Sequence, residues 1–295
     1  MIACMQGKKW LLLLVACGAV LLAAAQKNDK ALEDALLKMT QGFKGDIGFY
    51  IKNLKTGKVA SYNADTVFPT ASIVKVPILV GILDKLEKGE LNYHDQLTYA
   101  DSLYYAGVDI LGAFKDGEKI ELSKVIMLMC TTSDNTASLW LQQLAGTGTR
   151  INQLMDELRL PNTKVNSRTP GREEIRKQYG WGQTTPAEMA TLFEKMLQRE
   201  VINGHASDKM MRILSRNYWD EEGLSKIPPG VFVASKNGAV DASRSEVMYV
   251  NGHKTPYIFA VFTKNNEDRS WEPSNEAWEL TRRMSDFVWT YFNAE

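Results

Sequence analysis

The alternation of apolar and polar residues predicts a helix and a β-hairpin at the start of the globular part of the chain. Apolar residues recur at helical spacing over 32–39, and a Gly-Asp pair at 45–46 separates them from an apolar run at 47–51. The Lys-Thr-Gly sequence at 55–57 can close a hairpin between that run and a second strand at 59–62. A helix is therefore expected to lead into two antiparallel strands.

Near the other end, the pattern predicts three more strands and a closing helix. Apolar runs at 231–234, 246–250 and 257–263 have strand character, and Asn251-Gly252 begins the turn between the last two. Residues 278–288 show the spacing of a long amphipathic helix. The strands of one sheet are thus divided between the two ends of the chain.

The middle of the chain has helical periodicity. It is strongest over residues 76–86, 122–144, 151–158 and 189–197. We therefore predict an α+β fold of two lobes, an antiparallel sheet with terminal helices packed on it and an inserted all-helical lobe. The sheet lobe would comprise about 26–68 and 217–295, and the helical lobe about 69–216. A cleft between the lobes is the natural place for a site.

The first residues have the pattern of an export signal. Lys8 and Lys9 precede an apolar stretch at 10–22, and a small-residue cleavage site follows at 23–25. The prediction is a signal peptide at 1–25, with one two-lobed domain over 26–295.

Two alternatives to cleavage after this leader stay open. The apolar stretch could be a membrane anchor, although it is short for a span and no stop-transfer sequence follows it. Leu14-Val15-Ala16-Cys17 is similar to a bacterial lipobox, which would leave a lipid on Cys17. Signal cleavage predicts an exported protein that is periplasmic or secreted. Lipid modification predicts an exported protein that is held at a membrane through Cys17.

Composition argues against a nucleic-acid partner, a disulfide framework and a metal site. Basic and acidic residues number 35 each in the 295 residues, so no net charge would draw nucleic acid to the surface. Two of the three cysteines lie in the leader, which leaves Cys130 alone, and we expect it to be a buried apolar residue. The three histidines lack metal-ligand spacing, so no metal or other cofactor is expected. We expect a monomer.

Ser72-Ile73-Val74-Lys75 is an S-x-x-K tetrad followed by an apolar helical pattern. Residues three apart share one face of a helix, so the Lys75 amine can accept the Ser72 proton. Free N–H groups at a helix start also favour negative charge that develops there. Such a tetrad occurs by chance about once in a chain of average composition, so it needs further support.

Two further motifs come later in the chain. Ser133-Asp134-Asn135 lies between two apolar helical runs and offers a hydroxyl and an amide, although the same residue types also cap helices. Lys236-Asn237-Gly238 follows an apolar strand and could present a fixed charge to a substrate carboxylate. Asn-Gly is also an ordinary turn signal, so an unremarkable hairpin is the alternative.

The three motifs together, in this order, resemble the S-x-x-K, S-D-N and K-T-G signature of class A β-lactamases and related penicillin-binding proteins. Thr184-Thr185-Pro186, which opens a later helix, adds to the resemblance. A β-lactamase/transpeptidase-like fold is implied, with a small β-lactam or a D-Ala-D-Ala peptide as substrate.

The resemblance also assigns roles by position. Ser72 would be acylated, Lys75 would take its proton, and Ser133 would pass a proton to the leaving nitrogen. Asn135 would bind the acylamide side chain and Lys236 the substrate carboxylate. The backbone N–H groups of Ser72 and Ala239 would form the oxyanion hole. Arg244 would assist Lys236 with the carboxylate, or else be a solvated strand arginine.

Two departures from the family pattern bear on turnover and specificity. Asn237 stands where the family usually has threonine or serine, and its amide is bulkier than a hydroxyl. Thr169-Pro170 aligns with the glutamate-proline whose carboxylate activates the deacylating water. Glu173 is a candidate replacement base and Glu174 a second, although the stretch 172–177 also reads as a solvated charged segment.

These departures leave the activity open. The expectation is a class A-like β-lactamase with slow deacylation. The alternatives are a penicillin-binding D,D-peptidase, a non-catalytic cell-wall binding protein, and an esterase that uses the same nucleophile.

Overall fold

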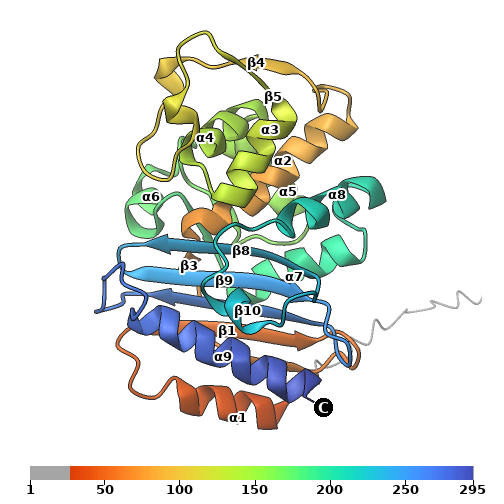
Figure 1. The fold of residues 1–295 in the computed structure, drawn as a ribbon, viewed down its shortest axis with the longest axis vertical. Helices are drawn as coiled ribbons and strands as arrows, with labels where there is room; N and C mark the ends of the chain where they lie inside the picture. Colours follow the sequence, from red (N-terminus) through yellow and green to blue (C-terminus); the bar gives the residue numbers. More distant parts are fainter. Residues whose placement is uncertain (1–26, 295) are drawn as a thin grey trace, which may run out of the picture.

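The computed structural model describes residues 27–294. An antiparallel sheet of five strands, in the order β2-β1-β10-β9-β8, forms the centre of the molecule (Figure 1). The strands are β1 (Asp46–Asn53), β2 (Val59–Tyr62), β8 (Val233–Val240), β9 (Ser243–Val250) and β10 (Tyr257–Lys264). Both chain ends contribute strands, as the apolar pattern predicts.

Two terminal helices cover one face of this sheet (Figure 1). α1 (Lys30–Met39) and α9 (Glu276–Asn293) turn their apolar stripes onto strand residues such as Met248 and Phe259. Polar side chains fix where these helices begin, since Asp29 and Asn275 accept hydrogen bonds from the first turns of α1 and α9. Residues of β9 thus alternate between this face and the face turned to the helical lobe.

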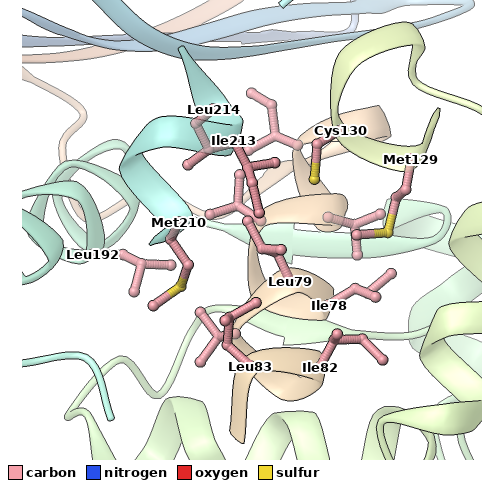
Figure 2. Packing of buried hydrophobic residues seen from close by; sticks show 14 of the residues in the cluster. Ile78, Leu79, Ile82, Leu83, Met129, Cys130, Leu192, Met210, Ile213 and Leu214 are labelled. Carbon is pink, nitrogen blue, oxygen red and sulfur yellow. The ribbon is translucent and has the colours of Figure 1, made fainter. Parts of the chain in front are cut away.

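The helical lobe lies on the opposite face (Figure 1). Its helices are α2 (Lys75–Glu87), α3 (Leu122–Met127), α4 (Asn135–Leu144), α5 (Thr147–Glu157), α6 (Glu173–Tyr179), α7 (Pro186–Leu197) and α8 (Gly204–Leu214). Figure 2 shows α2 at the centre of the lobe, where Ile78, Leu79 and Ile82 lie among side chains of the neighbouring helices. Burial of one such side chain contributes about 1.5–3 kcal/mol, so α2 is a rigid support for whatever its first turn carries.

Short strands form two further small sheets outside the main one. β3 (Phe68–Pro69), β7 (Gly182–Thr184) and β6 (Lys164–Val165) form one small sheet, and β4 (Gln96–Thr98) pairs with β5 (Lys119–Glu121). The sequence pattern does not predict them, because two or three residues are too few for an alternation to be recognised. The predicted strand at 231–234 is also displaced, because β8 runs on through Lys236 and Gly238 to Val240.

The proposed leader at 1–25 and its Cys17 lie outside the described residues. Within 27–294, no helix combines the length and the apolar character that a membrane span requires.

Candidate active site

Ser72 lies in a 3₁₀ turn, Ala71–Val74 (η1), that leads directly into α2. Backbone bonds fix the entry to this turn, because the Thr70 N–H donates to the Gly182 carbonyl at 3.0 Å. Ala71 takes the unusual φ of +44°, which turns the chain sharply just before Ser72. The apolar residues that follow anchor α2 in the core, so the serine sits at the end of a fixed helix.

Lys75 lies at the centre of the predicted residues and joins them. Its Nζ is 2.9 Å from Ser72 Oγ, 3.0 Å from Ser133 Oγ, 2.7 Å from the Ser133 carbonyl oxygen and 2.9 Å from Asn135 Oδ1. Sequence motifs 58 and 60 residues apart therefore meet around one nitrogen.

The hydrogen-bonding capacity of these four oxygens defines what Lys75 can do. The Ser133 carbonyl and Asn135 Oδ1 can only accept, so they take two N–H groups of Lys75. A neutral amine then has its lone pair left for one of the two serine hydroxyls, whereas an ammonium has a third N–H there. In its neutral form Lys75 is thus placed to accept a proton from Ser72 or from Ser133.

Burial favours that neutral form. Lys75 is 0% exposed, and removal from water, followed by the positive charge of Lys236, lowers its pKa well below the usual lysine value. The negative charge of Asp134 opposes this shift but is the smaller influence. A lysine base with a depressed pKa is what serine activation requires near neutral pH.

Ser133 owes its position to irregular backbone on both sides. A π-helical turn, Leu128–Thr132, ends at Ser133, which adopts a left-handed φ of +64°. Asp134 then caps α4 by accepting from the Ala137 N–H at 2.7 Å, and its other oxygen accepts from Ile110 N and Leu111 N. The capping alternative is therefore true of Asp134, while Ser133 and Asn135 are left free to face Lys75.

Strand β8 closes the other side of the site. It is an edge strand that packs against η1, and this contact brings Gly238 close to the nucleophile. A Cβ added at Gly238 would lie 2.5 Å from the Thr70 carbonyl oxygen and 2.9 Å from Ser72 N. Only glycine permits this approach, which places the backbone before Ala239 against that of Ser72.

Lys236 is fully buried on the face of β8 that is turned to the helical lobe, where its cross-strand partner Val247 joins the main core. Burial lowers the pKa of Lys236 to about 8. Its Nζ donates to the Asn237 carbonyl oxygen at 2.9 Å and to Asn237 Oδ1 at 3.3 Å. The Lys-Asn-Gly sequence thus lies within a strand rather than in the hairpin turn considered as its alternative.

Arg244 differs from its prediction. It pairs with Ala239 across the strands, three residues along β9 from Val247, so strand alternation puts Arg244 on the opposite face from Lys236. There its guanidinium lies against the rings of Trp271 and Trp278, with its Cζ 4.5 and 4.7 Å from their centroids, and the two rings also contact each other. Its hydrogen bonds run to the backbone carbonyls of Val240, Asp241, Ser243 and Ser270. Arg244 is 0% exposed, so the solvated-arginine alternative does not describe it either.

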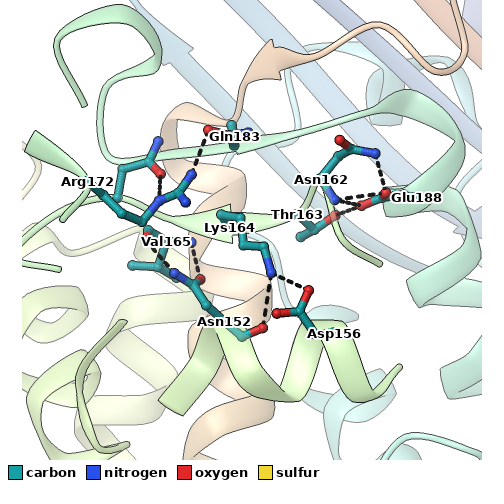
Figure 3. Close-up of polar contacts among 10 residues, drawn as sticks. Asn152, Asp156, Asn162, Thr163, Lys164, Val165, Arg172, Gln183 and Glu188 are labelled. Carbon is teal, nitrogen blue, oxygen red and sulfur yellow. Dashed lines mark hydrogen bonds and ion pairs between the residues drawn. The ribbon is translucent and has the colours of Figure 1, made fainter. Parts of the chain in front are cut away.

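The structure does not bring Glu173 to Lys75. Glu173 is an exposed residue at the start of α6, where its carboxylate accepts from Gly171 N at 3.2 Å. Thr169 is buried, and its hydroxyl donates to the Ser167 carbonyl at 2.9 Å. Among the described residues, neither forms a hydrogen bond with the Ser72, Lys75, Ser133 and Asn135 group. The loop around them is held by polar contacts such as those of Arg172 with Gln183 (Figure 3).

Sequence reasoning missed one segment that helps to shape the site. Trp219 Nε1 donates to the Thr132 carbonyl, and Asn217 Nδ2 donates to Ser235 Oγ, so this segment bridges the approaches to Ser133 and to Lys236. A polar and aromatic run between the last helix of the lobe and an edge strand is the signal that could have indicated it.

Cys130 is buried as predicted, and burial raises the pKa of its thiol to about 12. Across 27–294 we find no cluster of three or more metal-binding side chains.

Comparison with known proteins gives concordant results. A β-lactamase of Rhodobacter capsulatus is 22% identical over 263 residues, which cover 86% of each chain. A β-lactamase regulatory protein of Streptomyces cacaoi is 30% identical over 91 residues, but the match spans only 29% of that protein. Among solved structures, PBP-A superposes with a TM-score of 0.80 at 25% identity, over 90% of this chain and 97% of that one.

The β-lactamase from Sphaerobacter thermophilus superposes with a TM-score of 0.79 at 20% identity, over 90% of this chain and 97% of that one. The fold is therefore β-lactamase/transpeptidase-like, as expected from the motifs. The family model described as "Beta-lactamase enzyme family" matches residues 30–292, nearly all of the described chain. The protein belongs to the β-lactamase enzyme family and has the fold of its serine hydrolases.

Proposed function

We propose that this protein is a class A-like serine enzyme that opens β-lactam rings by forming an ester on Ser72 and releases that ester slowly. The observation that carries the proposal is the position of Lys75, within 3.0 Å of both serine hydroxyls and fully buried. A neutral amine in that place can serve the nucleophile and the proton donor in turn.

These residues can carry out every proton transfer of the acylation step. Ser72 Oγ attacks the lactam carbonyl carbon while Lys75 accepts the hydroxyl proton. Charge on the carbonyl oxygen is stabilised by the N–H groups of Ser72 and Ala239, and Lys236 holds the substrate carboxylate. The carbon–nitrogen bond then breaks, the nitrogen takes the Ser133 hydroxyl proton, and Ser133 regains one from Lys75. Asn135 orients the acylamide side chain.

Slow release follows from the loop that contains Thr169. A hydroxyl cannot act as a general base near neutral pH, and this one already donates to the Ser167 carbonyl. Glu173 is held at Gly171 instead. Since no carboxylate of residues 27–294 forms a hydrogen bond with the group around Lys75, water has to attack the ester without the base that class A enzymes use.

The same observation favours a second candidate, a penicillin-binding D,D-peptidase. The similarity to PBP-A supports it, and an acyl-enzyme complex with penicillin G exists for the L158E mutant of that protein. In such an enzyme the acyl group would come from a D-Ala-D-Ala peptide. An esterase or a non-catalytic binding protein has no observation of its own in its favour.

One pair of assays tests the proposal and separates the two candidates. With a chromogenic cephalosporin, we expect a burst equal to the enzyme concentration followed by slow steady turnover, and no D-alanine release from a D-Ala-D-Ala peptide. A burst without turnover, accompanied by D-alanine release, would replace the β-lactamase proposal with the peptidase. Absence of any burst would overturn both.

We also propose that the protein works outside the cytoplasm, because the predicted leader precedes a domain whose proposed substrates are β-lactams or cell-wall peptides. We propose that it works there as a monomer. Mass spectrometry of the mature amino terminus tests export. A terminus at Gln26 fits signal cleavage, a lipid-modified Cys17 fits the lipoprotein alternative, and an intact leader would contradict processing.

A further inference from the structure

Glu246 is a buried acid in β9, on the face of the sheet that α9 covers (Figure 1). Strand alternation puts it there, since its neighbour Val247 belongs to the core that the sheet shares with the helical lobe. Its Oε2 accepts from the Gly223 N–H at 2.7 Å and its Oε1 from the Leu224 N–H at 3.3 Å. A carboxyl group is costly to bury unless its oxygens are hydrogen-bonded, so this group and the two N–H groups hold one another in place.

Gly223 begins a short 3₁₀ turn, Gly223–Lys226 (η5), that packs against α9. A Cβ at Gly223 would lie 2.7 Å from Glu246 Oε2, so only glycine lets the backbone approach the carboxyl group this closely. On the other side, Ser285 Oγ of α9 donates to the Gly223 carbonyl oxygen at 2.7 Å, and Arg282 pairs with the preceding residue at 2.9 Å. Glu246 thus fixes the start of η5 from the strand, and α9 fixes it from the opposite side.

The chain just before η5 is bonded to the active site. We call residues 217–224 the linking segment. It donates two hydrogen bonds to carbonyls of the two residues before Ser133 and one to the hydroxyl of the residue before Lys236. These bonds are Tyr218 N to Thr131 O at 3.0 Å, Trp219 Nε1 to Thr132 O at 2.8 Å and Asn217 Nδ2 to Ser235 Oγ at 3.2 Å. One segment therefore joins Glu246 to the supports of both residues.

Ser133 and Lys236 both need such support. Ser133 has a left-handed φ of +64°, a conformation that persists only where its surroundings hold it. Lys236 lies in β8, which is an edge strand, so only one side of β8 is paired with another strand. Ser72, in contrast, is held by the buried helix α2 and has no bond to the linking segment within 27–294.

We propose that Glu246 is a positioning residue for acylation, which keeps Ser133 and Lys236 aligned with Ser72 by fixing the linking segment. Glu246 itself lies on the far face of the sheet and touches neither the substrate nor the reacting atoms. The inference rests on the proposed function, because it concerns the proton that Ser133 gives to the lactam nitrogen and the carboxylate that Lys236 holds.

The test is stopped-flow acylation by benzylpenicillin over a range of concentrations, with Tm measured on the same samples. The amplitude gives the fraction of active protein, and the concentration dependence separates the penicillin Kd from the acylation rate constant. Glu246→Ala should lower the rate constant about tenfold or more at nearly full amplitude, because small displacements of positioned groups reduce rates strongly. A lower amplitude with an unchanged rate constant would show a role in stability alone and would overturn the proposal.

Two further variants keep the test valid if Glu246→Ala folds poorly. Gly223→Ala breaks the same contact from the side of the linking segment and should slow acylation to a similar extent. Glu246→Gln keeps the shape and one acceptor oxygen, so its rate constant should lie between those of the wild type and Glu246→Ala. Wild-type rate constants in both Gly223→Ala and Glu246→Ala would refute the role of Glu246.

Arg244→Ala is the matched control, because Arg244 is also fully buried and lies on the same face of β9, two residues from Glu246. It should lower the Tm while the acylation rate constant of the folded protein stays within about twofold of the wild-type value. Hydrogen exchange in the peptide that spans 217–226 should quicken in Glu246→Ala and not in Arg244→Ala. Equal losses of rate in the two variants would contradict a specific role for Glu246.

The route through the linking segment is tested by a double-mutant cycle with Trp219→Phe, which removes the indole donor to Thr132. If Glu246 acts through this segment, the loss of rate in Glu246→Ala/Trp219→Phe should be clearly smaller than the product of the two single losses. A loss equal to that product would mean that the two residues act independently and would overturn the route. A wild-type protein that does not react with penicillin would overturn the proposed function itself, and this inference with it.

Discussion

At the scale of single residues, the account depends on two buried lysines that need opposite protonation states. Lys75 must be neutral to take the Ser72 proton, and Lys236 must be charged to hold a carboxylate. Burial lowers the pKa of both, that of Lys75 well below its usual value and that of Lys236 to about 8. Their close approach couples them, since the charge on Lys236 contributes to the shift at Lys75.

A bell-shaped pH profile should follow for acylation. The rate should rise with pH as Lys75 loses its proton and fall above pH about 8 as Lys236 loses its own. Lys236→Arg should move the alkaline limb to higher pH, because a guanidinium stays charged there. Stopped-flow acylation rates across pH would measure this, with Lys75→Ala slower by about a hundredfold or more as the control for the base. An alkaline limb that stays in place in Lys236→Arg would contradict the assignment.

Removal of the Glu173 carboxylate tests the loop. Since Glu173 is bonded to Gly171 N and not to the group around Lys75, Glu173→Gln should leave the steady rate of cephalosporin turnover within about twofold of the wild-type rate. Loss of a general base would instead lower the steady rate of turnover by a factor of about a hundred or more. Glu174→Gln serves as the matched control. A hundredfold loss confined to Glu173→Gln would restore that residue as the deacylation base.

At the scale of elements, the contact between β8 and η1 sets the geometry of the oxyanion hole. Gly238→Ala would place a methyl group 2.5 Å from the Thr70 carbonyl oxygen, so the strand or the turn must move. We expect acylation by penicillin to slow by about tenfold or more, since small displacements of positioned groups reduce rates strongly. Val240→Ala, an exposed change in the same strand, is the control. Equal rates in the two variants would show that this contact is not critical.

Arg244 connects β9 to the segment before α9, so we predict a structural role for it. Arg244→Ala would leave the carbonyls of Val240, Asp241, Ser243 and Ser270 without the guanidinium donor and would remove the cation from the Trp271 and Trp278 rings, which should lower the free energy of unfolding by about 3 kcal/mol. Denaturant titration measures this, with the exposed Arg212→Ala expected to change it by less than about 0.5 kcal/mol. Acylation by penicillins should change little in folded Arg244→Ala. A large, selective loss with carboxylate-bearing substrates would return Arg244 to the carboxylate site.

At the scale of the whole molecule, the sequence was informative where the determinants are local. Ser72 and Lys75 are three residues apart, so a helix start suffices to bring them together, and the apolar alternation was enough to divide one sheet between the chain ends. The face of the sheet on which Arg244 lies could not be predicted from local sequence in this way. It depends on the register between β8 and β9, and a change of one residue in that hairpin moves every later side chain to the other face.

Tertiary context also overrode one local signal and created contacts that no local signal indicates. Asn237-Gly238 is a strong turn signal, yet it lies inside β8 because Gly238 is needed where the strand passes η1. The partner of Asn166, and the absence of one for its Nδ2, could not be seen in the sequence at all, since Arg172 and Trp181 reach it through the folded loop.

The central claim is that Ser72 carries a persistent acyl group after reaction with a β-lactam, and time-resolved intact-protein mass spectrometry tests it most directly. Benzylpenicillin should add its full mass once to the wild-type protein, the adduct should map to the peptide that contains Ser72, and it should outlast removal of free drug by many times the acylation time. Ser72→Ala should show no adduct. A wild-type protein that remains unmodified without consuming penicillin, or an adduct that persists in Ser72→Ala, would contradict the account.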